Sequence, residues 1–97
     1  MNARARKPTH PGALLREDIL PAMGMTQREF ARRLGVSRRT ISEILHERRP
    51  ITPDMAIRLG RLLNTTPQSW LNMQVSVALW ELEHSHPETY HHIQPAA

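Results

Sequence analysis

Apolar residues recur every three or four positions in five segments of this chain, the spacing that places them along one side of an α-helix. The first segment follows Pro11, which is tolerated in the first turn of a helix, and Pro21 and Gly24 are expected to end it. Its apolar positions are Leu14, Leu15, Ile19 and Leu20. The pattern predicts a first helix over residues 11–20.

The second and third segments each begin at a residue whose hydroxyl can cap a helix. Thr26 and Glu29 form a capping box, in which the Thr26 hydroxyl accepts from the Glu29 amide and the Glu29 carboxylate accepts from the Thr26 amide. Gly35 supplies the positive φ that ends the second helix, and Ser37 caps the third. These signals predict helices over residues 27–34 and from Ser37 to about residue 46.

Two further helices begin at Thr-Pro pairs, which combine a capping hydroxyl with a proline at the first helical position. Thr52 precedes a helix expected to reach residue 64, and Thr66 precedes a longer one expected to reach about residue 84. Strand-like alternation is absent apart from a possible edge segment after residue 86. The fold class predicted is all-α, with five helices and a long helix at the C-terminal end.

The second and third helices are separated by only two residues, Gly35 and Val36, so they must meet at a steep angle. Ala31 offers a small side chain where the helices cross. The apolar pattern across both helices consists of Phe30, Leu34, Val36, Ile41 and Ile44. Together with two caps, this pattern predicts a helix-turn-helix at the centre of the domain.

The third helix has a wholly polar outer face, because the helical repeat places Ile41 and Ile44 inward and Arg39 and Glu43 opposite. Arginine can bridge the O6 and N7 atoms of guanine, and glutamate can accept from cytosine N4. An ordinary solvated face is the less favoured interpretation. The predicted DNA-contacting residues are Gln27, Arg28, Ser37, Arg38, Arg39, Thr40, Ser42, Glu43, Arg48 and Arg49, of which Gln27, Arg28, Arg48 and Arg49 suit phosphate contacts.

Charge is divided between the two parts of the chain. All thirteen Lys and Arg residues lie within residues 1–61 together with six acidic residues, a net charge of +7, whereas residues 62–97 hold three acidic residues and no Lys or Arg, a net charge of −3. This division suits a protein that presents one side to a polyanion and another to a protein partner. A randomly solvated surface is the alternative.

Composition excludes several classes of protein. With no cysteine, the chain has no disulfide, thiolate metal site or Cys nucleophile. Its Ser and His residues fall at helix caps, on the predicted DNA face or in the tail, so we expect no enzyme activity and no cofactor. The apolar runs are too short to span a bilayer and residues 1–8 lack the apolar stretch of a secretion signal, which predicts a cytoplasmic protein.

The fifth helix carries two apolar stripes, more than one core contact requires. One stripe consists of Trp70, Met73, Val77 and Trp80 and can close the core. The other stripe consists of Leu71, Val75, Ala78 and Leu82, and Leu79 lies beside it. Below, the second stripe includes Leu79. We expect this second stripe to form a homodimer interface, although burial of both stripes within one chain is an alternative.

The ends of the chain have weaker patterns. Residues 1–8, with Arg4, Arg6 and Lys7, form a basic flexible arm that either reaches DNA or remains idle, residues 9–85 form the domain, and residues 86–97 form a mobile tail. Four histidines near the end, His84, His86, His91 and His92, allow a metal site, but a solvated tail is favoured because no recognised ligand spacing is present.

Three segments narrow the prediction further: His10-Pro11-Gly12, the pair Ile51-Thr52, and Trp70-Leu71-Asn72-Met73-Gln74. Together with the helix-turn-helix, they resemble the HigA/VapI-type antitoxins of the Cro/C1 repressor superfamily over about residues 9 to 83. The resemblance implies a Cro/C1-like fold, repression of the protein's own operon and an inhibited complex with a HigB-like ribonuclease toxin.

The dimer predicted above would bind double-stranded DNA at a palindromic operator. A basic toxin could dock on the acidic residues Glu81, Glu83 and Glu88 or, alternatively, on Glu17 and Asp18. A stand-alone phage- or plasmid-type repressor and a helix-turn-helix adaptor for proteins are the other functions considered.

Overall fold

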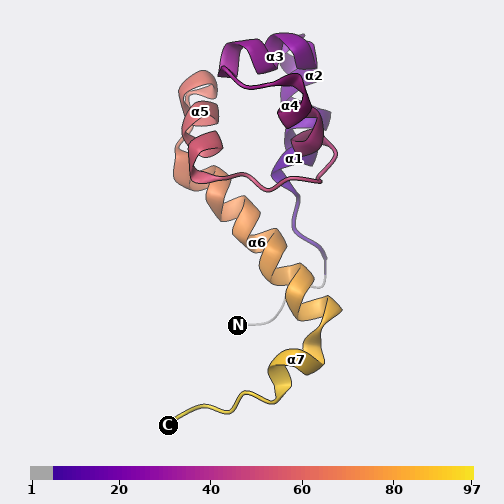
Figure 1. Ribbon diagram of the computed structural model, residues 1–97, viewed down its shortest axis with the longest axis vertical. Helices are drawn as coiled ribbons and strands as arrows, with labels where there is room; N and C mark the ends of the chain where they lie inside the picture. Colours follow the sequence, from indigo (N-terminus) through magenta and orange to yellow (C-terminus); the bar gives the residue numbers. More distant parts are fainter. Residues whose placement is uncertain (1–5) are drawn as a thin grey trace.

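The computed structural model describes residues 6–97, and Figure 1 shows a globular group of short helices from which one long helix extends. Arg4, a member of the predicted arm, lies outside the described residues. The elements are α1 (Pro11–Leu14), η1 (Leu15–Ile19), α2 (Leu20–Met23), α3 (Gln27–Leu34), α4 (Arg38–Leu45), α5 (Pro53–Leu63), α6 (Pro67–Ser85) and α7 (Pro87–His91). Residues 6–97 contain no strand, so the predicted all-α class is confirmed.

The first predicted helix is longer than expected, because Pro21 does not end it. Elements α1, η1 and α2 follow one another with right-handed helical backbone at each junction and so form one continuous helix, the first helical rod. This rod ends at Gly24, which has a φ of 62°. The η1 segment is π-helical, and the Leu20 amide donates to the Leu15 carbonyl. This wider turn accommodates a proline, whose ring and missing N–H would otherwise disrupt the α-helical ladder. The prediction that the helix stops at residue 20 is therefore wrong.

The helix-turn-helix is formed by α3 and α4 as predicted. Thr26 accepts from the Glu29 amide at 3.1 Å and Ser37 accepts from the Thr40 amide at 3.0 Å. Gly35 adopts φ of 75° between the two helices. One half of the expected capping box differs, since the Glu29 carboxylate accepts from Arg32 at 3.1 and 2.6 Å rather than from the Thr26 amide.

The core lies between the short helices and the first half of α6. Phe30, Ile41 and Ile44 from the helix-turn-helix are at most 1% exposed. Trp70 closes the core from α6, and its indole N–H donates to the Thr65 hydroxyl at 2.8 Å, which satisfies its one polar atom in the interior. The second half of α6 extends beyond the globular part, and α7 and the C-terminal end follow it (Figure 1).

The tail and the arm carry structure that the sequence did not predict. Residues 87–91 of the tail form helix α7 rather than an edge strand. Lys7 in the arm forms an ion pair of 2.8 Å with Glu81 on α6. No helix of residues 6–97 combines the length and the apolar character needed to cross a membrane.

Candidate nucleic-acid interface

Helix α4 presents its polar face to solvent. Its apolar residues Ile41, Ile44 and Leu45 are each 1% exposed, whereas the Arg39 side chain is 85% exposed. The burial of one side fixes the rotation of α4 about its axis, so the opposite side must face outward. The inward positions and the outward position of Arg39 predicted from the helical repeat are therefore confirmed, whereas Glu43 on the same outer side is half-buried.

The other predicted DNA-contacting residues surround this face. Gln27, Arg28, Ser37, Arg38, Arg48 and Arg49 are exposed, and Thr40, Ser42 and Glu43 are half-buried. Ser37 and Thr40 share a hydroxyl hydrogen bond of 2.9 Å at the first turn of α4. The structure thus brings the predicted residues to α4, to the start of α3 and to the loop after α4, but their contact with DNA stays a prediction.

Glu43, one of the predicted base contacts, is engaged by two arginines. Its carboxylate accepts from Arg49 at 2.9 and 2.6 Å and from Arg39 at 3.3 Å. The guanidinium groups of Arg49 and Arg39 hold the pKa of the Glu43 carboxyl below its usual value. The outer face of α4 therefore carries a small ion-pair network rather than independent side chains.

Two arginines outside the predicted set hold the ends of the helix-turn-helix. Arg16 on η1 donates to the carbonyl of Leu45, the last residue of α4, at 2.5 Å. Arg58 on α5 donates to the carbonyls of Leu34 and Gly35, at 2.9 and 3.3 Å, where α3 ends. Both guanidinium groups satisfy carbonyls that a helix end leaves unpaired and lie at the negative end of a helix dipole. Their sequence separations of 29 and 24 residues leave no local signal by which they could have been found.

The His10-Pro11-Gly12 segment places the first helical rod against α4. His10 is buried, and its Nδ1 accepts from the Gly12 amide at 2.9 Å, which caps α1. Gly12 faces the Ile44 carbonyl so closely that any Cβ would overlap with it. This contact explains why the segment needs a residue without a side chain.

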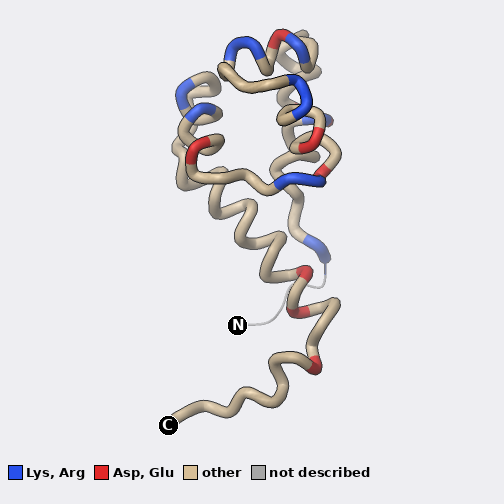
Figure 2. Tube along the Cα trace, viewed as in Figure 1, with Lys and Arg blue, Asp and Glu red and all other residues tan. Residues whose placement is uncertain are grey.

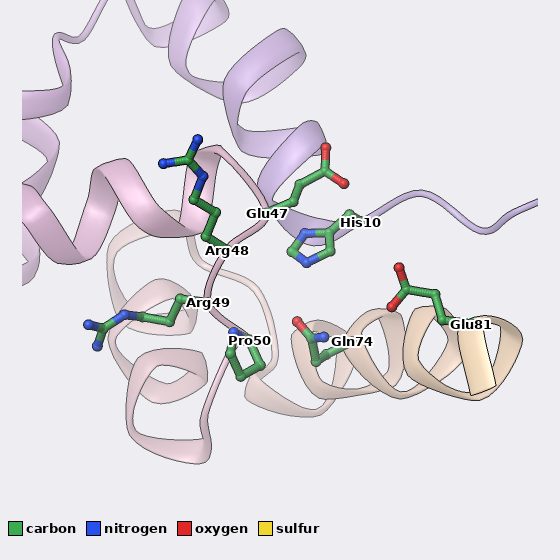
Figure 3. Close-up of a pocket in the computed structure, with 7 residues that line it drawn as sticks. All are labelled: His10, Glu47, Arg48, Arg49, Pro50, Gln74 and Glu81. Carbon is green, nitrogen blue, oxygen red and sulfur yellow. The ribbon is translucent and has the colours of Figure 1, made fainter. Parts of the chain in front are cut away.

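A polar cavity of about 210 Å³ lies where this capped end meets the α4–α5 loop and α6. Figure 3 shows His10, Gln74 and Glu81 around it, while the side chains of Arg48 and Arg49 extend away from these three. Gln74 joins two of the elements, because its side-chain oxygen accepts from the Ile51 amide at 3.0 Å. The same loop that presents the two arginines is therefore held from behind by α6.

Charge follows the division that the sequence predicts. Figure 2 shows most of the Lys and Arg residues on the globular part and only acidic charges along α6 and α7. Lys7 in the N-terminal arm is an exception, since it lies beside α6 and pairs with Glu81. Part of the basic arm therefore belongs to the acidic half of the molecule rather than to the α4 face.

The second stripe of α6 is exposed in its central part. Val75, Leu79 and Leu82 are 53%, 54% and 46% exposed, and Ala78 between them is also exposed. Leu71 differs, because it is partly buried and packs against the core. In contrast, Trp70 and Val77 of the first stripe are buried, and its other two members, Met73 and Trp80, are half-buried. The four histidines lie in the same region, and among residues 6–97 no group of three His, Asp or Glu side chains could hold a metal ion.

Comparison with known proteins agrees with this architecture. A helix-turn-helix family model matches residues 15–70. Antitoxin HigA-1 of Vibrio cholerae is 33% identical over 95 residues, which cover 98% of this chain and 90% of that protein. The solved structure of Pseudomonas aeruginosa antitoxin HigA with the higBA promoter is 37% identical, with a TM-score of 0.87 over 94% of this chain and 100% of the other. The structure of antitoxin GraA in complex with its operator is 38% identical, with a TM-score of 0.89 over 100% and 99% of the two chains.

The fold and the polar α4 face therefore define a helix-turn-helix protein of the DNA-binding transcriptional regulators. Within that class, the chain belongs to the HigA family of antitoxins, the family that the three sequence segments had indicated.

Proposed function

We propose that this protein is an antitoxin that acts in the cytoplasm as a dimeric repressor: it binds a palindromic operator of its own operon and neutralises a HigB-like ribonuclease toxin. The role requires binding only, with no catalytic step and no cofactor. The observation that carries the proposal is the exposed polar face of α4, held in place by capped ends and a buried apolar side. Operator DNA bound to the related GraA, and promoter DNA with the related HigA, support the DNA half of it.

The DNA half is tested with the DNA upstream of the protein's own gene. We expect an electrophoretic mobility shift at nanomolar protein, because specific sites are bound about a thousandfold or more tightly than random DNA at physiological salt. A scrambled duplex of the same length and composition is the control. Equal affinity for the two duplexes would contradict a sequence-specific repressor.

The dimer is supported by the exposed stripe on α6. Val75, Leu79 and Leu82 leave apolar side chains in water along a helix that projects from the core, and a second copy of the chain can cover them across a two-fold axis. Such a dimer would place two α4 helices on successive turns of a duplex, about 34 Å apart.

Sedimentation of the wild type and of two α6 variants tests this interface. Leu79→Asp adds a charge to the stripe and is expected to give a monomeric mass at micromolar concentration. His84→Asp adds the same charge on the other side of α6, where His84 stacks on Trp80 with ring centres 4.0 Å apart, and should leave the dimer intact. A monomeric wild type would exclude the proposed dimer.

The toxin half rests on the family and on charge. A ribonuclease that binds RNA is expected to be basic, since phosphate neutralisation supplies most of such affinity. The part of the chain after residue 61 carries acidic residues without Lys or Arg, so it can face a cationic protein while α4 faces DNA. Glu83 is the cleaner docking candidate, because Glu81 is already paired with Lys7.

Co-expression with the neighbouring gene product, followed by affinity purification, tests the pairing. Charge reversal at Glu81 and Glu83 is expected to lose the partner, whereas reversal at Glu17 and Asp18 should retain it. The opposite result would place the toxin on the first helical rod. Absence of co-purification together with no rescue of growth would leave a stand-alone repressor.

A further inference from the structure

Glu43 stands between two arginines on the outer face of α4. Arg49 from the loop after α4 donates through Nε and Nη2 to one carboxylate oxygen, and Arg39, one turn before Glu43, donates to the other. Both oxygens of Glu43 are thus occupied, and its side chain is 28% exposed, compared with 85% for Arg39 and 45% for Arg49. The network joins α4 to its following loop without any contribution from the core.

The position of this network matters because it lies on the surface that would meet a duplex. Arg39 is the most exposed arginine of an ion pair among the described residues, and Arg49 extends away from the cavity behind the loop (Figure 3). Each arginine alone could bind a phosphate or a base edge. With Glu43 between them, the trio carries one net positive charge rather than two, and a phosphate must compete with a carboxylate that is already in contact.

We propose that Glu43 is a positioning and specificity-determining residue, which holds Arg39 and Arg49 as an internal counter-ion and so suppresses binding to DNA of the wrong sequence. This proposal rests on the DNA-binding function proposed above. On the correct operator, base and phosphate acceptors placed for both guanidinium groups replace the carboxylate. On an unrelated sequence only scattered phosphates are offered, and the ion pairs persist.

The proposal differs from the sequence-based expectation that Glu43 itself reads a cytosine. A base-reading glutamate contributes on the operator alone, so its loss would weaken operator binding and leave random DNA nearly unaffected. A counter-ion acts most on random DNA, so its loss would strengthen that binding. Loss of a base-reading Glu43 would therefore mainly lower the affinity for the operator, whereas loss of a counter-ion would mainly raise the affinity for random DNA.

The experiment measures binding of Glu43→Gln and Glu43→Ala to the upstream DNA and to the scrambled duplex across a salt series. We expect affinity for the scrambled duplex to rise about three- to tenfold for each added phosphate contact, with a salt slope steeper by about 0.9 per contact. Operator affinity should change less, so the ratio of the two affinities falls. Glu29→Gln is the matched control, because it removes the same negative charge and releases Arg32 from a similar exposed ion pair on α3.

A double-mutant cycle shows whether the released arginine causes the higher affinity for scrambled DNA. Arg49→Ala in the Glu43→Gln background should remove the gain on scrambled DNA, because the guanidinium that made the new contact is gone. The proposal is overturned if Glu29→Gln raises the affinity for the scrambled duplex as much as Glu43→Gln does. It is also overturned if the higher affinity of Glu43→Gln survives both Arg49→Ala and Arg39→Ala. A third contradicting result would be that both Glu43 variants lose operator affinity with no increase in affinity for scrambled DNA. A wild type that prefers neither duplex would instead contradict the proposed function.

Discussion

The guanidinium of Arg16 donates to the carbonyl oxygen of Leu45 at 2.5 Å, and this bond ties the first helical rod to the last residue of α4. The same side chain also contacts Glu47 at 3.3 Å and Glu17 at 2.7 Å. Glu47 adopts a left-handed backbone with φ of 61°, so the chain reverses direction where Arg16 holds it. The α4–α5 loop, which presents Arg48 and Arg49, is therefore positioned by a residue in η1.

Arg16→Ala should loosen the C-terminal turn of α4. With no guanidinium on the Leu45 carbonyl, faster amide exchange is expected at His46 and Glu47, whose amides close that turn by donating to Ser42 and Ile44. Operator affinity should fall with it. Arg61→Ala removes the same charge from the exposed end of α5 and should leave exchange in α4 unchanged. Equal exchange rates in the two variants would contradict the role of Arg16.

Gly12→Ala is expected to be strongly destabilising. The added Cβ would overlap with the Ile44 carbonyl, and backbone cannot yield as a flexible side chain does, so we expect a loss of about 3 kcal/mol in the free energy of unfolding. Gly24→Ala is the comparison, because Gly24 has open space around it and only its φ of 62° opposes a side chain, at about 1 kcal/mol. Urea unfolding measures both. A smaller loss at Gly12 than at Gly24 would show that the rod can move away from α4.

His10 should make stability depend on pH. Burial lowers the pKa of its imidazole below the usual 6.5; nearby Glu47 and Glu81 act in the opposite direction, while Lys7 and Arg16 act in the same one. Because the folded-state pKa lies below the unfolded one, the stabilising contribution is complete above about pH 6.5 and is lost as the pH falls through the folded-state value. A protonated Nδ1 also cannot accept from the Gly12 amide.

Thermal unfolding between pH 7.5 and 5 measures this effect. His10→Asn is the control, since asparagine retains a capping oxygen but does not titrate in this range. The wild type should lose more stability on acidification than the variant does. Parallel pH profiles for the two proteins would exclude His10 as the source of the dependence.

Arg39→Ala and Arg48→Ala should separate base reading from phosphate binding. Arg39 is expected to contribute about 1 to 3 kcal/mol of discrimination against a mismatched base pair, which its loss would remove. Arg48→Ala should weaken operator and scrambled DNA alike and reduce the salt slope by about 0.9. Titrations against the upstream DNA, single-mismatch duplexes and the scrambled duplex measure both. Unchanged mismatch penalties in Arg39→Ala would show that another residue reads the base.

Much of the architecture could be predicted from the sequence, because its causes are local. The caps at Thr26, Ser37, Thr52 and Thr66 act within three residues of themselves, as does the turn at Gly35. The helical spacing of Ile41 and Ile44 determines which side of α4 is buried, and therefore that Arg39 faces outward. Short-range hydrogen bonds and the helical repeat depend on residues close together in the sequence, so they can be predicted from it.

Other features depend on residues that only folding brings together. Arg16 meets Leu45, Arg58 meets Leu34, and Arg49 meets Glu43 across a change of chain direction. Pro21 would end an isolated α-helix, yet the first helical rod continues beyond it, because a π-helical turn with Leu15 and Leu20 buried in the core precedes the proline. The sequence thus specifies the elements and their buried sides through local interactions. The tertiary structure decides which charged groups meet at helix ends and on the α4 face, because those contacts depend on distances between elements that no local pattern encodes.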